Sequence, residues 1–404
     1  MTTITTANLL ADGQLLRAAE RLRPDVDPAE VAARAAWSVL TEPGDGVAGA
    51  LVAAFGAQGA LDQSLSDATL RAPLEAVGAK AMSEAVQRWR PRADSRAVAG
   101  ALHDAEAVGA RILLPDDPEW PTGLDDLGPH APLMLWVRGT REALLAQETV
   151  SIVGARASTG YGEGIAAELA GDLATTGVSI VSGGAYGIDG AAHRAALGVG
   201  GTTVAFLAGG VDRSYPAGHQ QLFERIRARG AVVSEVPCGA APTKWRFLQR
   251  NRLIAGAGLA TVVVEAGHRS GTLNTAGHAA ALGRPLGAVP GPVTSAASAG
   301  CHRLLREFDA ICVTSAAEVR ELWSDAAPVQ GLTPAPDPDL VRLMDALSAR
   351  SPRHVPELAR RSGLSLERVR SLLGMLDLEG GVARRETGWI RLNRSAEGEN
   401  RRRV

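Results

Sequence analysis

Cysteine and the aromatic residues are scarce in this chain of 404 residues. The three cysteines, Cys238, Cys301 and Cys312, show no CxxC spacing, which argues against a disulfide framework and a structural zinc site. Aromatic residues make up 4% of the chain, so Ala, Val and Leu must fill most of the interior. A hydrophobic content of 46% is nevertheless enough for well-buried cores.

Long apolar runs and targeting signals are also missing. No stretch approaches 18 uninterrupted apolar residues, which argues against a transmembrane helix. Residues 1–6 lack the basic region and apolar core of a signal peptide, so we expect a cytoplasmic protein. The formal net charge is −2, so only the distribution of charge along the chain is informative about an acidic partner.

The common signatures of nucleotide-dependent and hydrolytic enzymes are absent. There is no Walker A motif, no GxGxxG dinucleotide motif, and no HExxH or GxSxG sequence. The eight histidines show no convincing ligand pairing. We therefore expect neither a metal nor a cofactor, and no catalytic residue is assigned.

The first third of the chain predicts a helical domain, followed by a connector. Apolar side chains such as Leu9 and Leu15 recur at helical spacing, which favours a small helical (SAM-like) domain at 1–108. Residues 111–138 contain five prolines and end in the apolar run Leu133–Val137. This segment is interpreted as a connector that packs on the next domain.

The pattern changes at Thr149, where short apolar runs begin to alternate with helical segments. Val262–Val264 is apolar throughout, as expected of strands buried on both faces of a parallel sheet. Residues 109–325 therefore predict a Rossmann-like, doubly wound, mostly parallel α/β domain. Strands are expected at Val150–Val153, Val178–Val181, Thr203–Leu207, Ala231–Val236, Ala260–Val264, Leu286–Val289 and Ile311–Thr314. Helices are expected at Tyr161–Thr175, Ile188–Leu197, His219–Arg229, Leu273–Leu282 and Cys301–Glu307.

The last part of the chain predicts a second small domain behind a linker. Residues 326–338 contain four prolines and are interpreted as a linker. Three helical stretches and a hairpin within 339–394 indicate a winged-helix domain, and the polar tail 395–404 is expected to be disordered. The stretches are Leu340–Leu347, Val355–Arg361, Leu366–Leu378, Val382–Arg385 and Trp389–Leu392.

Glycine and small polar residues follow most strands of the predicted sheet. Ligands of open parallel sheets bind beyond the carboxyl ends of the strands, where glycines allow close approach and helix amides favour phosphate. Asp189 and Glu265 are the two acids in these turns that we consider as catalytic groups. Each has a structural alternative, since Asp189 stands where it caps a helix and Glu265 among arginines with which it can pair. The turn residues of the predicted site are Ser158, Ser182, Gly183, Gly184, Gly187, Asp189, Ser270, Gly271 and Thr272.

Positive charge is concentrated in one segment of the same domain. Between Val236 and Arg306 there is one carboxylate, Glu265, and there are eight basic residues. An acid-free groove suits a polyanion, and the nearby Trp245, Phe247 and Tyr215 are candidate stacking surfaces for unpaired bases. The alternatives are salt bridges to acids elsewhere for the cations and core packing for the rings. The cationic and polar residues of the predicted site are Arg156, Arg213, Lys244, Arg246, Arg250, Asn251, Arg252 and Arg269.

Together, these motifs resemble the DNA-processing protein A family (DprA, also called Smf). The resemblance covers roughly residues 110–320 and is weaker in the two flanking domains. Its most specific segments are Val153–Arg156, Ser182–Asp189, Gly210–Pro216, Ser234–Pro237, Phe247–Gly256 and Gly283–Gly291.

The resemblance implies a protein that binds and protects single-stranded DNA without catalysis. It also implies loading of the RecA recombinase on that strand during natural transformation, and a homodimer formed through the Rossmann-like domain. Arg156 matches the family arginine that contacts the DNA backbone. The sequence departs from the family pattern at Ala217 and His219, near the rim of the predicted groove.

Two other functions remain open on the sequence. The fold also resembles nucleoside-phosphate hydrolases of the lysine-decarboxylase-like group, and Ser270-Gly271-Thr272 stands where their Gly-Thr motif lies. Thr275, however, occupies the position of their catalytic Glu, which leaves water activation without a base. The other possibility is a non-catalytic interaction scaffold that acts through its winged helix.

Overall fold

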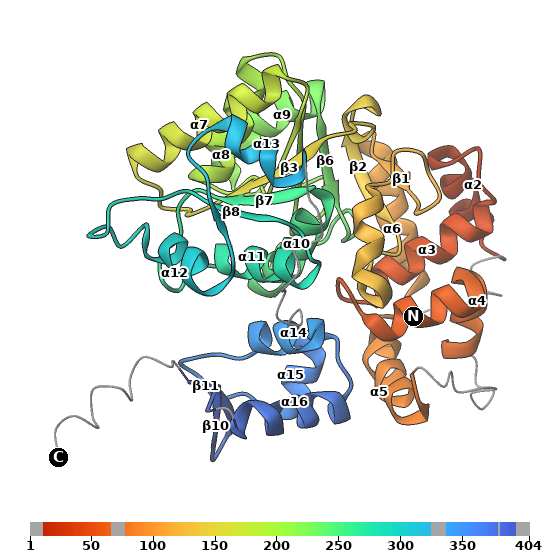
Figure 1. Cartoon of the computed structure of the whole chain (residues 1–404). Coiled ribbons are helices and arrows are strands. Elements are labelled where there is room, and N and C mark those ends of the chain that lie inside the picture. Colours follow the sequence, from red (N-terminus) through yellow and green to blue (C-terminus); the bar gives the residue numbers. More distant parts are fainter. Residues whose placement is uncertain (1–10, 66–76, 325–336, 379, 393–404) are drawn as a thin grey trace.

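The structure is a computed structural model that describes residues 11–65, 77–324, 337–378 and 380–392. These residues form an N-terminal helical part, a large α/β part and a small C-terminal domain (Figure 1). The Rossmann-like fold with a helical N-terminal region and a C-terminal winged helix is therefore confirmed. The predicted tail 395–404 lies outside the described residues, as do 326–336 of the predicted linker.

The N-terminal part is a bundle of helices with a small alanine-rich core. Trp37 and Trp89 lie at its centre, fully buried, with ring centroids 5.1 Å apart in an edge-to-face arrangement. Aspartates 12, 27 and 94 cap three of the helices by accepting hydrogen bonds from free amides. The helices are α2 (Gly13–Leu22), α3 (Pro28–Leu40), α4 (Gly46–Leu65), α5 (Ala79–Trp89) and α6 (Ser95–Ala107).

The α/β part is built on one sheet whose nine described strands run in the order β1-β2-β6-β5-β4-β3-β7-β8-β9. Strands β3 to β9 pair in parallel, whereas β1 and β2 pair antiparallel at one end. The strands are β1 (Arg111–Leu113), β2 (Leu135–Gly139), β3 (Thr149–Val153), β4 (Ser179–Ser182), β5 (Thr203–Phe206), β6 (Ala231–Ser234), β7 (Ala260–Val263), β8 (Leu286–Ala288) and β9 (Ile311–Cys312).

The interpretation of residues 111–138 as a connector was incomplete. They supply β1 and β2, and Trp136 of β2 stands opposite Ser234 of β6 in the ladder. The buried residues Leu135, Trp136 and Val137 continue the sheet core into this segment, because β2 closes the edge that β6 would otherwise expose.

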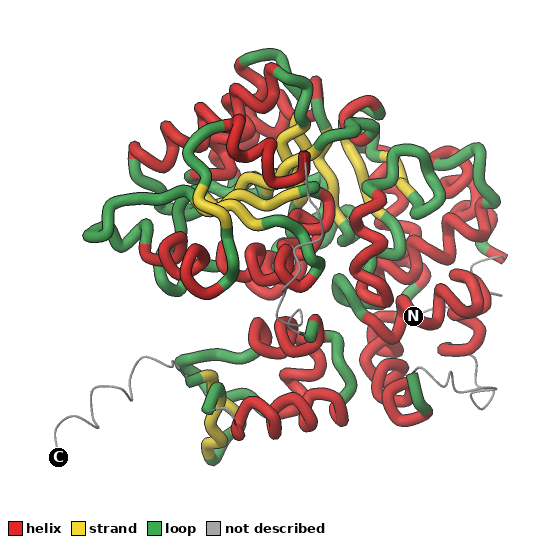
Figure 2. The backbone as a smooth tube through the Cα atoms, in the orientation of Figure 1, coloured by secondary structure: helices red, strands yellow, loops and turns green. Residues whose placement is uncertain are grey.

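Helices cover both faces of the sheet (Figures 1 and 2). Alternate strand residues point to opposite faces, so Val150 and Ile152 share a core with α7 and α8, while Val153 packs on the side of α10 and α11. This arrangement explains the continuously apolar strands. The helices are α7 (Gly160–Thr175), α8 (Ile188–Gly198), α9 (Gln220–Arg229), α10 (Lys244–Ala257), α11 (Thr272–Ala281), α12 (Ala299–Glu307) and α13 (Ala316–Ser324).

Helix α10 is absent from the predicted elements. The side chain of Thr243 caps it by accepting a hydrogen bond from the amide of Arg246 at 3.2 Å. Polar residues, among them Arg250 and Arg252, are buried in the middle of this helix and interrupt the apolar periodicity by which a helix is recognised in a sequence.

The C-terminal domain has the predicted three helices and hairpin. Gly363, with φ of 68°, forms the left-handed turn between the second and third helices. Trp245 and Leu248 of α10 pack into its apolar core, which joins this domain to the α/β part. Its elements are α14 (Pro338–Ala346), α15 (Val355–Ser362), α16 (Leu366–Leu378), β10 (Val382–Arg385) and β11 (Gly388–Arg391).

Candidate nucleic-acid interface

The strand order of the sheet reverses between β3 and β7, which lie side by side although β4, β5 and β6 separate them in sequence. In Rossmann-like folds such a switch point is where phosphate groups bind, at the N-terminus of the first helix. Here that helix is α7. Its first turn, the neighbouring loops and the face of α10 turned toward them make up the region in which the sequence places the site.

The anion position at the start of α7 is filled by the chain itself. The carboxylate of Glu265, which is 1% exposed, accepts hydrogen bonds from the amide of Thr159 at 2.9 Å and from its hydroxyl at 2.6 Å. A Cβ atom on Gly162 would lie 2.3 Å from this carboxylate, so the group is pressed against the helix backbone. We call Thr159, Gly162 and Glu265 the closed turn. It leaves no room for a phosphate, and Glu265 holds a helix terminus instead of pairing with an arginine.

The predicted turn residues near the closed turn are likewise engaged within the protein. Ser158 donates a hydrogen bond to Glu163 at 2.8 Å. Thr272 donates to the carbonyl of Gly154 at 2.8 Å, and Ser270 donates to the hydroxyl of Thr272 at 3.0 Å. These residues tie β3, β7 and α11 together, and their hydroxyl groups are committed to the turns that they form.

The loop between β4 and α8 is held from beneath by Arg250. The Arg250 guanidinium donates hydrogen bonds to the carbonyls of Gly183 and Phe206, and its burial lowers the pKa of the group to about 10. A Cβ atom on Gly183 would lie 2.3 Å from this guanidinium, which explains the glycine. The sequence placed Arg250 in the DNA site. In this arrangement its guanidinium faces the protein interior and does not reach a DNA phosphate.

Asp189 and Ser182 complete this internal support. The carboxylate of Asp189 accepts a hydrogen bond from the amide of Ala185 at 3.2 Å, and burial raises the pKa of the group. Ser182 donates to the carbonyl of Ile152 at 2.6 Å. Gly184 and Gly187 both adopt positive φ, at 70° and 77°, so the loop conformation requires them. These residues shape the loop and do not present side chains to solvent.

Two further residues of the predicted site lie on α10 and also face inward. The side-chain amide of Asn251 donates to the side-chain oxygen of Asn274 at 2.9 Å and helps to fix the start of α11. Arg252, 1% exposed, donates from one nitrogen to both carboxylate oxygens of Glu235 at 2.7 Å. Arg252 thus points toward the junction with the other two domains, away from the loops of the sheet edge.

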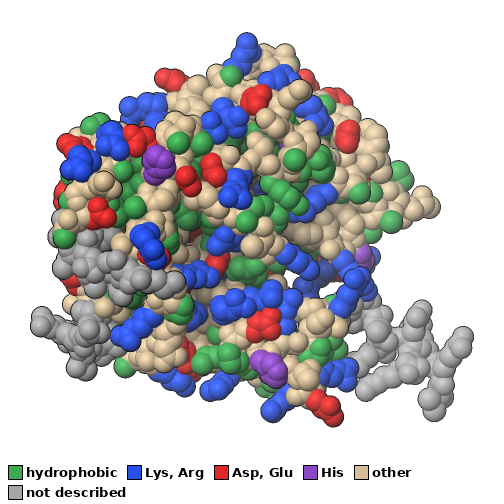
Figure 3. Space-filling model, turned by 180° about the vertical axis from the view of Figure 1, so that it is seen from behind, with side chains coloured by type: hydrophobic (Ala, Val, Ile, Leu, Met, Phe, Trp, Pro, Cys, Tyr) green, Lys and Arg blue, Asp and Glu red, His purple; other side chains and the backbone are tan. Residues whose placement is uncertain are grey.

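Folding brings acidic residues next to the basic segment between Val236 and Arg306. Acids outside the segment pair with four of its eight cations, so the salt-bridge alternative holds for half of them. The pairs are Arg246 with Glu42, Arg252 with Glu235, Arg284 with Asp126 and Arg303 with Glu307. Lys244, Arg269 and Arg306 are exposed and have no ion pair within the described residues. Figure 3 shows acidic and basic side chains interspersed over the upper back face, with basic ones gathered near the C-terminal domain.

Aromatic rings gather at the ends of β3, β4 and β5 with the exposed Arg156, which has no ion pair in the part of the chain that the structure describes. Tyr186 and Tyr215 are each 49% exposed, so both rings are accessible to a ligand. Phe247, half-buried on α10, lies with its ring centroid 5.5 Å from that of Tyr215. The guanidinium of Arg156 lies over the Phe247 ring at 4.6 Å. We call Arg156, Tyr186, Tyr215 and Phe247 the open surface.

The open surface differs in part from the predicted site. Arg156 belongs to both, and the exposed Arg213 lies on the loop that carries Tyr215, 3.4 Å from Asp212. Tyr186 was missed, although an aromatic residue inside a glycine-rich loop is a signal that the sequence contains. Trp245, a candidate stacking residue, is instead buried in the core of the winged helix. His219 packs edge-on against Tyr186, with centroids 4.8 Å apart, and so supports this ring.

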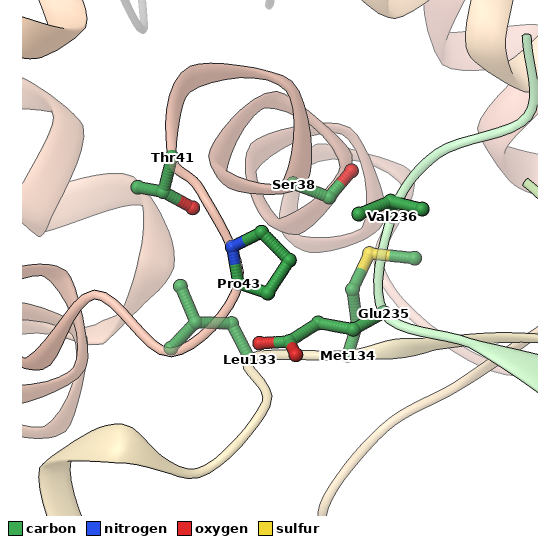
Figure 4. A pocket seen from close by; sticks show the side chains of 7 residues that line it. All are labelled: Ser38, Thr41, Pro43, Leu133, Met134, Glu235 and Val236. Carbon is green, nitrogen blue, oxygen red and sulfur yellow. The ribbon is translucent and has the colours of Figure 1, made fainter. Parts of the chain in front are cut away.

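A small pocket lies away from the open surface, at the seam between the helical part and the sheet (Figure 4). Its one titratable lining residue, Glu235, is already engaged by Arg252. The described residues contain no group of three or more His, Cys, Asp or Glu side chains suited to a metal ion. In the same part of the chain, no helix is both long enough and apolar enough to span a bilayer.

Comparison with known proteins assigns the family. The family described as DNA recombination-mediator protein A matches residues 111–324, and the one described as DprA winged helix domain matches residues 327–388. The chain therefore belongs to the DNA recombination-mediator protein A family, whose members are called DprA or Smf.

Curated relatives and a solved structure agree with this assignment. A putative DNA processing protein DprA from Mycobacterium tuberculosis is 45% identical over 309 residues, covering 72% of this chain and 79% of that protein. Protein Smf of Escherichia coli is 36% identical over 274 residues, covering 65% and 73%. The crystal structure of DprA from Streptococcus pneumoniae matches with a TM-score of 0.58 and 30% identity, covering 72% of this chain and 97% of that one.

Proposed function

We propose that the chain binds single-stranded DNA without sequence preference, on the open surface, and does not cleave it. The observation that carries this proposal is the stacking of the Arg156 guanidinium on Phe247 beside the exposed Tyr215. Rings at the surface offer stacking platforms to unpaired bases of any sequence, and an unpaired arginine next to them suits the phosphates between those bases.

The open surface gives the predicted site residues two different roles in this proposal. Arg156, Arg213 and Lys244 are exposed and contact the strand, together with the rings of the open surface. Arg269 extends the positive potential from the β7 loop. The buried residues act beneath the surface by fixing the loops, and they are Ser182, Gly183, Gly184, Gly187, Asp189, Arg250 and Asn251.

The closed turn supports a polymer as ligand over a mononucleotide. A free nucleotide in a Rossmann-like fold relies on the amides at the first helix, and Glu265 already binds those amides. Thr275, where the alternative hydrolase needs a carboxylate, is 2% exposed and offers no general base. Both observations favour holding a strand over hydrolysing a nucleoside phosphate.

We infer the partners from family membership and from one feature of the sheet. A homodimer through the Rossmann-like domain is consistent with β9, a two-residue strand at the edge of the sheet whose Ile311 is 54% exposed. Loading of RecA on the bound strand, in the cytoplasm and during natural transformation, completes the proposed role. Sedimentation of the protein with and without Ile311→Asp tests the dimer, which should dissociate in the variant.

A titration of labelled oligonucleotides tests the DNA proposal. Fluorescence anisotropy with a single strand and a duplex of equal length, each over a range of salt, should show tighter binding of the single strand. Arg156→Ala should weaken it about tenfold and flatten the salt dependence, because one phosphate contact is lost.

The matched control is Arg229→Ala, which removes an exposed arginine at the opposite edge of the sheet and should change neither quantity. Equal affinity for single strand and duplex would refute the single-strand proposal. Unchanged affinity and salt slope in Arg156→Ala would show that the DNA site does not include the open surface around Arg156.

A further inference from the structure

Helix α10 presents two faces to two different parts of the protein. Residues 247 and 250 face the sheet edge, where Phe247 meets Arg156 and Arg250 holds the β4–α8 loop. Residues 245, 248 and 252 lie three, four and seven positions apart and form the opposite face. On that face, Trp245 and Leu248 pack with Leu343 of α14 in the apolar core of the winged-helix domain.

Two buried arginines, one from α10 and one from the winged-helix domain, meet the helical part beside this face. Arg252 and Arg342 of α14, 1% and 2% exposed, both lie against Gly44 of the helical part. A Cβ atom on Gly44 would lie 2.6 Å from Arg342 and 2.7 Å from Arg252, and its φ of 72° favours glycine as well. We call Gly44, Arg252 and Arg342 the arginine junction. It is the place where all three parts of the chain meet.

Of the two arginines of the junction, Arg252 has a direct ion pair and Arg342 has none within the described residues. Glu235 binds Arg252 and accepts a hydrogen bond from the amide of Gly44 at 3.0 Å, whereas Arg342 donates to His130, a neutral partner. Burial and the neighbouring Arg252 lower the pKa of Arg342 to about 10. Among the described residues, two guanidinium nitrogens of each arginine find no hydrogen-bond partner. Docking at the junction therefore depends on close fit, and small changes there should release the domain.

Docking also covers the end of the helix that usually reads duplex DNA. In helix-turn-helix proteins the first residues of the last helix contact base edges. Here the amide of Leu366, at the start of α16, donates to Glu84 of α5 at 2.6 Å, and Lys80 lies 3.8 Å from Glu367. The helical part thus occupies the reading end of α16. In the docked state the winged helix is turned inward, toward the rest of its own chain.

We propose that the docked winged-helix domain positions the open surface, with Arg342 as the positioning residue that acts through Arg252 and α10. The proposal rests on the proposed binding of single-stranded DNA. Leu248 is adjacent to Phe247 in α10 and Trp245 lies two residues before it, so packing on one face of the helix fixes the position of the ring on the other. When the winged-helix domain undocks, α10 loses its packing partner on one face. The Phe247 ring on the other face is then no longer held in position for a base.

Two variants break the arginine junction from opposite sides. Arg342→Ala removes a guanidinium from α14, and Gly44→Ala adds a methyl group on the helical part without changing the charge. Both should accelerate hydrogen exchange at residues 364–368, since the Glu84 bond is lost, and both should weaken single-strand binding about tenfold. Arg360→Ala, at an exposed arginine of α15, is the matched control and should leave both unchanged.

A double-mutant cycle separates positioning from general loss of stability. If Arg342 acts through Phe247, then Arg342→Ala should cause little further loss of affinity in a Phe247→Ala background. Faster exchange at 364–368 with unchanged DNA affinity, or additive losses in the cycle, would overturn the proposal. If the wild-type protein fails to bind the single strand, the proposed function falls while the exchange result still reports on docking.

Discussion

The closed turn and the open surface are the two halves of the sheet edge and lie side by side. The closed turn already binds a carboxylate of the protein, whereas the open surface has a cation available for a ligand. At the closed turn the helix amides of α7 receive the carboxylate of Glu265, so the anion is part of the fold. At the open surface the Arg156 guanidinium rests on Phe247 without an ion pair in the described residues, so its charge is free for a ligand. The edge of a Rossmann-like sheet can thus keep the backbone geometry of a phosphate site while a carboxylate of the protein occupies that site.

This difference shows why glycine-rich turns alone are weak evidence for a ligand. The glycines at 162 and 183 both stand where a side chain would collide, one with Glu265 and the other with Arg250. Each makes room for a side chain of the protein itself. A ligand and a neighbouring side chain both need a glycine where they approach the backbone closely, so the glycine alone does not tell them apart.

The largest effect is expected from opening the closed turn. Glu265→Ala should lower the free energy of unfolding by about 3 kcal/mol, because the buried amide of Thr159 loses its acceptor and α7 loses a stabilising charge. Glu265→Gln keeps an acceptor and should cost about 1 kcal/mol. Urea unfolding measures both, and inorganic phosphate should stabilise only the alanine variant.

Affinity for single-stranded DNA is the second measurement on these variants. It should stay within about twofold of the wild type, as expected of a site on the other half of the edge. A large loss of affinity in a folded Glu265→Ala protein would contradict the division of the edge into two halves.

The next largest effect is expected from removing an aromatic ring of the open surface, compared with removing one beside the closed turn. Phe247→Ala should weaken single-strand binding about tenfold, the usual contribution of one base stacked on an aromatic ring. Tyr161, 46% exposed at the start of α7, donates a hydrogen bond to the carbonyl of Pro290. Tyr161→Ala should leave affinity unchanged in the same anisotropy assay. Equal losses in both variants would mean that the strand runs across the whole edge.

The sequence predicted the layers of the fold better than the roles of its arginines. Apolar strands such as Val262–Val264 are recognisable because both of their faces are buried, which needs no knowledge of partners. Arg250 and Arg252 were assigned to DNA because their charge is visible in sequence. Their partners, a Gly183 carbonyl and Glu235, are brought to them only by folding. For the same reason a helix that buries arginines escaped recognition.

Exposure at the edge of the sheet, unlike ion pairing, is a property that the sequence does reveal, as Arg156 and the overlooked Tyr186 show. Both stand in loops directly after strands, where the fold itself places side chains at the edge. Their exposure follows from that position and needs no distant partner.

The smallest expected effect separates a free cation from a paired one on the same turn of α10. Lys244 is exposed and has no ion pair in the described residues, whereas Arg246 is bound by Glu42 at 3.0 Å. Lys244→Ala should reduce the salt slope of binding by about one and the affinity a few-fold, because one phosphate contact and its displaced counterion are lost. Arg246→Ala should leave the slope unchanged, since its guanidinium is already held by Glu42. A reduced slope in Arg246→Ala would show that DNA displaces Glu42, and that the open surface extends onto the helical part.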